Sequence, residues 1–197
     1  MQAIWVFVTD CGDSAVTVPL ALLTLIFLVA AGQRRLAFSW ILTIAGCAAA
    51  IAVLKLGFGA CGQHLPIVHI VSPSGHTAMS TVVYGSLALL ISAQLSVFHR
   101  RILYVTATVA IVGIALSRLM LHNHDLAEIA VGFGIGVGAV AIFRGMLRRS
   151  EAPALPLGWL LLSGSALIAV MHGTRWIIEP TVHHFAELFR RALPGCQ

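Results

Sequence analysis

The chain has 197 residues, of which 59% are hydrophobic and only 10% charged, with a mean hydropathy of +0.96. Soluble domains carry roughly 25% charged residues, so the composition excludes a water-soluble globular protein. The formal net charge of +5 does not indicate nucleic acid, because the basic residues form short clusters between apolar stretches and not a stripe beside stacking aromatics. Anionic lipid headgroups are the expected counter-charge.

About six apolar stretches approach the roughly 20 residues that a transmembrane helix needs. They predict an all-α fold, a polytopic transmembrane bundle of about six helices, at approximately Ser14–Gly32, Phe38–Gly57, His76–Gln94, Ile102–Leu121, Ala127–Phe143 and Leu155–His172. We expect one transmembrane domain over residues 1–175. The segment Met1–Asp13 contains no Lys or Arg and so lacks the basic region of a cleaved signal peptide, which predicts that the first span is retained.

Loop charges predict the topology, because Lys and Arg are kept on the cytoplasmic side of a membrane. Basic clusters occur at Gln33–Arg35, His99–Arg101 and Arg144–Arg149. Each follows an odd-numbered span, so the three share one side, which we assign to the cytoplasm. The start of the chain, the segment Phe58–Gly75 and the C-terminal tail then lie on the outer side.

Three further features are predicted to have structural roles. Residues 176–197 form an amphipathic interfacial tail, with apolar residues at helical spacing and two arginines behind them. Glycines at every second position allow close helix packing, at Gly132, Gly134, Gly136 and Gly138. Cys47 is a small core residue, whereas a disulfide such as Cys11 to Cys61 is an open alternative on the outer side.

Polar residues at membrane depth are costly and indicate function, and the first such group opens the third span. We expect Ser72 as N-cap and Pro73 as the first helical residue. The amides of Ser74, Gly75 and His76 would then lack intrahelical partners and form an anion site at the helix start. Ser74 can add a hydroxyl donor and His76 a proton. The alternative is a capped helix start with an incidental histidine.

The second group closes the fourth span and opens the fifth. Arg118 offers a planar fork that suits phosphate oxygens. His124 follows after a short loop, and Glu128 lies one helical turn further on the same face, where it can orient the imidazole. An oriented histidine beside bound phosphate can act as a nucleophile. Glu128 has an alternative role with Asp125 as a capping box, and the two roles are compatible.

Together these residues resemble two signature motifs of the type 2 phosphatidic acid phosphatase superfamily, which also includes vanadium haloperoxidases. The matching segments are Pro73-Ser74-Gly75-His76 and Ser117-Arg118-x5-His124-x3-Glu128, in that order and facing one side. The resemblance extends from Lys55 to about Gly132, so residues 55–132 form the motif core. Two motifs with this internal spacing are a far more specific signal than the first alone.

The resemblance implies a role for each matching position. His124 would attack phosphorus and form a phosphohistidine, Glu128 would orient it where the family usually has aspartate, and His76 would protonate the leaving oxygen. The phosphate would be bound by Lys55, Ser74, Gly75 and Arg118. No metal ion or other cofactor is implied, because cationic side chains and helix-end amides neutralise the phosphate.

The chain departs from the family in the first signature motif. Relatives have Arg-Pro after lysine and six residues, but Lys55 is followed at that distance by Gly62-Gln63. The missing charged hydrogen bond corresponds to about 1.5–3 kcal/mol. Candidate replacements are Gln63, His64, His69 and an arginine of the tail.

The sequence therefore predicts a membrane phosphatase acting on a lipid monophosphate or diphosphate. Candidate substrates are phosphatidic acid, phosphatidylglycerol phosphate, polyprenyl diphosphate and lipid A, and resemblance and compactness suggest a bacterial inner membrane with the site facing the periplasm. Alternatives are an inactive lipid-phosphate-binding or transport protein, and a lipid phosphotransferase. A metal site is a further alternative, built from His64, His69, His76, His122 and His124.

Overall fold

The computed structural model describes residues 2–61, 72–150 and 153–176. These residues form α-helices and no β-strand, which confirms the predicted all-α fold. The helices are α1 (Gln2–Asp10), α2 (Ser14–Ala30), α3 (Arg34–Cys61), α4 (Gly75–Ser92), α5 (Val97–Met120), α6 (Leu126–Leu147) and α7 (Leu157–Met171). Helices α2 to α7 correspond to the predicted apolar stretches, whereas α1 was not predicted.

Four described segments are long and apolar enough to cross a membrane, namely Gln2–Ala30, Arg34–Gly59, Val97–Met120 and Leu126–Leu147. Helix α7 is apolar but shorter, and α4 has 18 residues with many hydroxyl groups. Large apolar side chains are exposed on the outer helices, for example Ile26, Phe38 and Val109. These features support association with a membrane.

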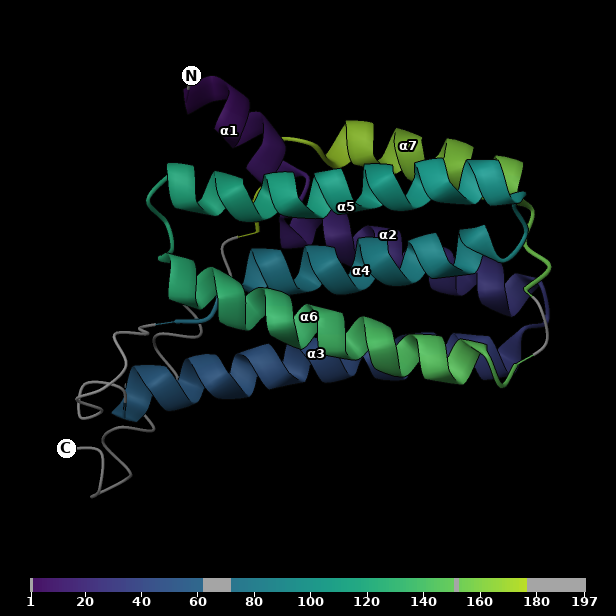
Figure 1. Cartoon of the computed structure of the whole chain (residues 1–197), viewed down its shortest axis with the longest axis horizontal. Coiled ribbons are helices and arrows are strands. Elements are labelled where there is room, and N and C mark those ends of the chain that lie inside the picture. The colour runs from purple at the N-terminus through teal and green to yellow at the C-terminus, as the bar shows by residue number, and fades with distance from the viewer. Residues whose placement is uncertain (1, 62–71, 151–152, 177–197) are drawn as a thin grey trace.

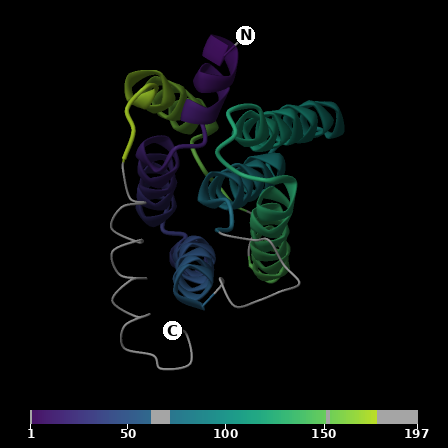
Figure 2. The same ribbon diagram turned by 90° about the vertical axis from the view of Figure 1, so that its left-hand side faces the viewer.

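Helix α4 lies in the middle of the bundle and contacts α2, α3, α5 and α6 (Figures 1 and 2). The loops between α2 and α3, α4 and α5, and α6 and α7 all lie at one end (Figure 1). There, Arg34, Arg35 and Arg149 line one cavity, so the basic clusters share an end as the charges predict. The signature motifs lie at the opposite end.

Hydroxyl side chains explain how α4 can be central without being strongly apolar. Thr77, Ser80 and Thr81 are 0–3% exposed. The hydroxyls of Ser80 and Thr81 donate to the Thr77 carbonyl, at 3.2 and 2.6 Å, so these donors are satisfied within the helix. Small side chains of this kind let neighbouring helices approach closely, as in other membrane bundles.

The glycine repeat of α6 has one packed face and one open face. A Cβ on Gly132 would collide with the Ser74 carbonyl oxygen, and one on Gly136 would lie 2.6 Å from Thr81 Cβ. At Gly134 and Gly138 nothing lies within 4 Å among the described residues. The close-packing prediction is therefore confirmed for Gly132 and Gly136, which bring α6 against α4.

Several predictions concern residues outside the described ranges. These are the interfacial helix of the tail from residue 177 onward, the pairing of Cys196, and the roles of Gln63, His64 and His69. Cys11 and Cys47 are free thiols. The domain boundary at residue 175 stays a prediction.

The two faces of the repeat provide a matched test. We expect Gly132→Ala to destabilise the protein by about 1–3 kcal/mol, because the new methyl group overpacks the contact with Ser74. Gly134→Ala should change stability by less than about 1 kcal/mol, since it fills open space and alanine favours a helix. Thermal unfolding in detergent compares the two variants, and equal losses would contradict this packing.

Candidate active site

The start of α4 is fixed by contacts to α6. Ser74, and not the predicted Ser72, is the N-cap, and its hydroxyl accepts from the Thr77 N–H at 3.4 Å. The Ser72 N–H donates to the Glu128 carboxylate at 2.7 Å, and the Ser74 N–H donates to the Glu128 carbonyl at 3.1 Å. These bonds hold the backbone of residues 72–74 to α6, and the helix begins two residues later than predicted. The Ser74 hydroxyl and the Ser74 N–H are therefore both engaged, by the helix cap and by Glu128, and phosphate binding at Ser74 stays a prediction.

Glu128 is buried in the first turn of α6, with 6% of its surface exposed. One carboxylate oxygen, Oε1, accepts from Ser72, and the other, Oε2, lies 2.7 Å from His124 Nδ1. A longer contact of 3.4 Å from the Asp125 N–H to Oε2 provides the capping interaction. The carboxylate thus both orients His124 and caps α6.

His124 is 8% exposed, between α5 and α6. Its Nδ1 faces a carboxylate, which fixes the tautomer with the proton on Nδ1 and leaves the Nε2 lone pair for chemistry. Burial lowers the pKa of His124 below its ordinary value, and the charges of Arg118 and Lys55 act in the same direction, against the bond to Glu128. A neutral imidazole is the nucleophilic form.

Two predicted phosphate ligands come from the ends of long helices. Arg118 lies in the last turn of α5, is 8% exposed, and donates from Nη1 to Thr9 Oγ1 at 3.2 Å. Lys55 lies in α3, and its Cε is 3.8 Å from where a Cβ on Gly75 would be. The Lys55 side chain therefore passes beside the first turn of α4. The first-turn N–H groups of a helix have no partner within the helix, so the lysine and these amides can act on the same anion.

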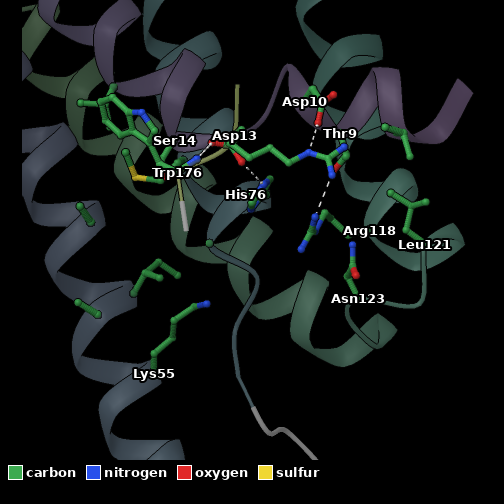
Figure 3. A pocket seen from close by; sticks show the side chains of 18 residues that line it. Thr9, Asp10, Asp13, Ser14, Lys55, His76, Arg118, Leu121, Asn123 and Trp176 are labelled. Atoms are coloured by element: carbon green, nitrogen blue, oxygen red, sulfur yellow. Dashed lines mark hydrogen bonds and ion pairs between the residues drawn. The ribbon is translucent and has the colours of Figure 1, made fainter. Parts of the chain in front are cut away.

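A pocket of about 590 Å³ joins these groups (Figure 3). Four predicted site residues line it, Lys55, Gly75, His76 and Arg118. Asn123 also lines it, whereas Ser74, His124 and Glu128 are buried beside it. The apolar part of its wall comes from Val6, Val18, Ala48, Ile51, Ala52, Met79, Leu121 and Trp176, and further polar lining comes from Thr9, Asp10, Asp13, Ser14 and Arg175.

The sequence did not predict that both termini of the described chain reach this pocket. Asp10 and Asp13 line it from the N-terminal side and Arg175 and Trp176 from beyond α7. Arg175 Nε donates to Asp10 Oδ1 at 2.9 Å, and the Trp176 N–H donates to Asp13 Oδ1 at 3.2 Å. Two aspartates in an otherwise apolar segment were the available signal, because charges at such positions indicate function.

Arg175 is the described residue that fits the predicted replacement for the missing arginine. It shares the pocket with Arg118, and the two guanidinium groups bond to consecutive residues of α1, Asp10 and Thr9. Its side chain is 55% exposed, so it can change partners more readily than the buried Arg118.

Three histidines of the alternative metal site lie within the described ranges, and each has a separate environment. His76 Nε2 lies 3.3 Å from Asp13 Oδ2, His124 is bonded to Glu128, and His122 is exposed with φ of 54°. Within the described ranges, no group of three or more His, Cys, Asp or Glu side chains is arranged to hold a metal ion.

Comparison with known proteins defines the class to which these motifs belong. Residues 57–151 match the PAP2 superfamily, a segment that includes both signature motifs and begins just after Lys55. This region of the chain is therefore similar to the PAP2 superfamily, whose members are generally phosphatases, and the predicted resemblance is confirmed.

One relative is described only as an uncharacterized 22.5 kDa protein in the cps region of Klebsiella pneumoniae. It is 28% identical over 157 residues, which cover 79% of this chain and 75% of the relative. No solved structure gives a significant match.

The pocket can be tested as an anion site without reference to turnover. We expect vanadate to raise the thermal unfolding temperature, and Lys55→Ala and Arg118→Ala to weaken its binding roughly 10- to 100-fold, because each removes a charged hydrogen bond of about 1.5–3 kcal/mol. Arg34→Ala, at the opposite end of the bundle, is the control and should bind normally. Equal binding by all three variants would contradict the site.

Proposed function

We propose that the protein is a membrane-embedded phosphatase that hydrolyses a lipid phosphate or diphosphate through a phosphohistidine on His124. The observation that carries this proposal is the buried pair of His124 Nδ1 and Glu128 Oε2, 2.7 Å apart. It stands beside a pocket lined by Lys55 and Arg118. An oriented neutral imidazole next to an anion site is the arrangement needed for nucleophilic attack on phosphorus.

In the first step, His124 Nε2 attacks phosphorus and a P–N bond forms as the bond to the lipid oxygen breaks. The Nδ1 proton remains shared with Glu128, which stabilises the positive charge that develops on the ring. His76 gives a proton to the leaving oxygen, so the lipid departs as an alcohol or, from a diphosphate, as a monophosphate.

In the second step, water attacks the phosphohistidine and the P–N bond breaks. His76, now neutral, accepts a proton from the water as general base. Inorganic phosphate leaves, and His124 and His76 return to their starting protonation states. Lys55, Arg118 and the first-turn amides of α4 stabilise the added negative charge in both steps, so the proposal requires no metal ion.

The apolar wall of the pocket supports a lipid as substrate. Ala48, Ile51 and Met79 lie beside the cationic end, so one cavity offers phosphate ligands and a surface for hydrocarbon. We place the site at the outer face of a bacterial inner membrane, because the basic clusters gather at the other end of the bundle and basic loops stay in the cytoplasm. Phosphatidic acid, phosphatidylglycerol phosphate, polyprenyl diphosphate and lipid A all fit this description.

Replacement of the nucleophile is the direct test. His124→Ala should reduce phosphate release to background across a panel of these four lipids, because no P–N bond can form. His122→Asn is the control, since this exposed neighbour has positive φ, which asparagine tolerates, and it should retain activity. Full activity of the His124 variant would exclude the mechanism, and a wild-type protein that releases no phosphate from any lipid would favour an inactive binding protein.

The state of His124 also predicts a pH dependence. The neutral form is the nucleophile, and its pKa is lowered from the ordinary value of 6.5, so His124 stays neutral as pH falls to that value and becomes protonated only below it. We therefore expect kcat/KM to show an acidic limb below pH 6.5. A limb attributable to His124 and centred above 6.5 would show that the folded environment favours the imidazolium instead.

A further inference from the structure

Asp13 holds the second histidine of the site from an element outside both motifs. It is the N-cap of α2, and its side chain is 8% exposed. Its Oδ2 lies 3.3 Å from His76 Nε2, and Figure 3 shows the two side chains facing each other at the pocket. The contact joins residues that are far apart in the sequence.

The rest of the Asp13 carboxylate is fixed by backbone groups. Oδ1 accepts from the Ala15 N–H at 2.8 Å and from the Trp176 N–H at 3.2 Å. With Oδ1 held by α2 and by the segment after α7, the carboxylate has little freedom to rotate. Oδ2 is therefore presented to His76 in a defined direction.

We propose that Asp13 is a positioning residue for His76, holding its Nε2 so that Nδ1 faces the leaving oxygen. This inference rests on the proposed function, in which His76 is the general acid. The arrangement of Asp13 and His76 is similar to that of Glu128 and His124. In both pairs a carboxylate contacts one ring nitrogen, and the other nitrogen is left for the reaction. Each histidine of the site thus has its own carboxylate.

The proton balance assigns a distinct task to each ring nitrogen. As the P–O bond breaks, the Nδ1 proton of the His76 imidazolium goes to the leaving oxygen, and the Nε2 proton stays with Asp13. In hydrolysis Nδ1 regains a proton from water, and the attacking oxygen becomes part of inorganic phosphate. Asp13 stays ionised throughout and exchanges no proton.

Asp13 also has an electrostatic role beside His76. Lys55, Arg118 and Arg175 line the same pocket as His76, so an imidazolium would add a further positive charge. Asp10 is engaged by Arg175, which leaves Asp13 as the carboxylate in contact with His76. Its negative charge offsets the repulsion that the protonated acid experiences.

The test separates this role from helix capping by using two leaving groups. Asp13→Asn keeps an oxygen acceptor for the Ala15 and Trp176 N–H groups but removes the charge and the orientation of Nε2. The comparison uses kcat/KM, which reports formation of the phosphohistidine and not its hydrolysis. With dodecyl phosphate, whose alkoxide needs a proton to leave, kcat/KM should fall roughly 10- to 100-fold, a part of the 10²- to 10⁴-fold typical of acid catalysis. With 4-nitrophenyl phosphate, whose leaving group departs without protonation, kcat/KM should change less than about threefold.

Three matched variants complete the design. Asp13→Glu should recover part of the dodecyl phosphate activity, because it restores the carboxylate. Asp10→Asn, which removes the pocket carboxylate bound to Arg175, should leave the ratio of the two substrates unchanged. In a His76→Asn background, Asp13→Asn should cause no further loss with dodecyl phosphate, because Asp13 acts through His76.

The opposite outcomes are equally definite. Equal losses of kcat/KM on both substrates, or an additive loss in the His76→Asn background, would show that Asp13 only stabilises the fold. A wild-type protein that hydrolyses neither these phosphates nor any of the four lipids would contradict the proposed function itself, and this inference with it. Thermal unfolding of each purified variant in detergent identifies any loss that comes from misfolding.

Discussion

The candidate site depends on one residue, Glu128. Its two carboxylate oxygens and its backbone carbonyl connect the start of α4 to the start of α6. It receives the Ser72 N–H and His124 Nδ1 on its side chain, and the Ser74 N–H on its main chain. A charged acceptor at 6% exposure is stable only when its partners are in place. Because the same residue sets where α4 begins and how His124 is oriented, the two histidines of the site cannot be arranged independently.

The packing of α6 against α4 serves the same end. Gly132 lies one turn beyond Glu128 and faces the Ser74 carbonyl, where a side chain would collide. The hydrogen bonds from Ser72 and Ser74 to Glu128 require the backbones of α4 and α6 to lie close together. The absence of a side chain at Gly132 permits this approach. Lys55 and Arg118 then approach from neighbouring helices, and α1 and the N-cap of α2 close the remaining side with Thr9 and Asp13.

Local patterns predicted much of this arrangement. Hydropathy located α2 to α7. Motif spacing predicted the contact of His124 with Glu128 and placed His76 and Arg118 at the same end of the bundle, where they line one pocket. The prediction of the N-cap was wrong because contacts between residues distant in the sequence determine where α4 begins. Both Ser72 and Ser74 have the chemistry of an N-cap, and only the bonds from Glu128 select Ser74.

Local sequence patterns also did not predict that α1 and the segment after α7 contribute to the pocket. Asp10 meets Arg175 across 165 positions of sequence, and Asp13 meets Trp176 across 163. No local pattern encodes pairs at such separations. Composition alone shows that two aspartates in an apolar segment need partners, and only the folded chain shows which partners they have.

The central place of α4 has a consequence for biogenesis. A helix with Thr77, Ser80 and Thr81 buried among its neighbours, and with hydroxyl groups along much of its length, is poorly suited to stand alone in hydrocarbon. It leaves the ribosome before α5 and α6, two of the helices that shield it. Stable integration of α4 must therefore await the later helices, and the pocket at its start is completed only after most of the chain has been synthesised.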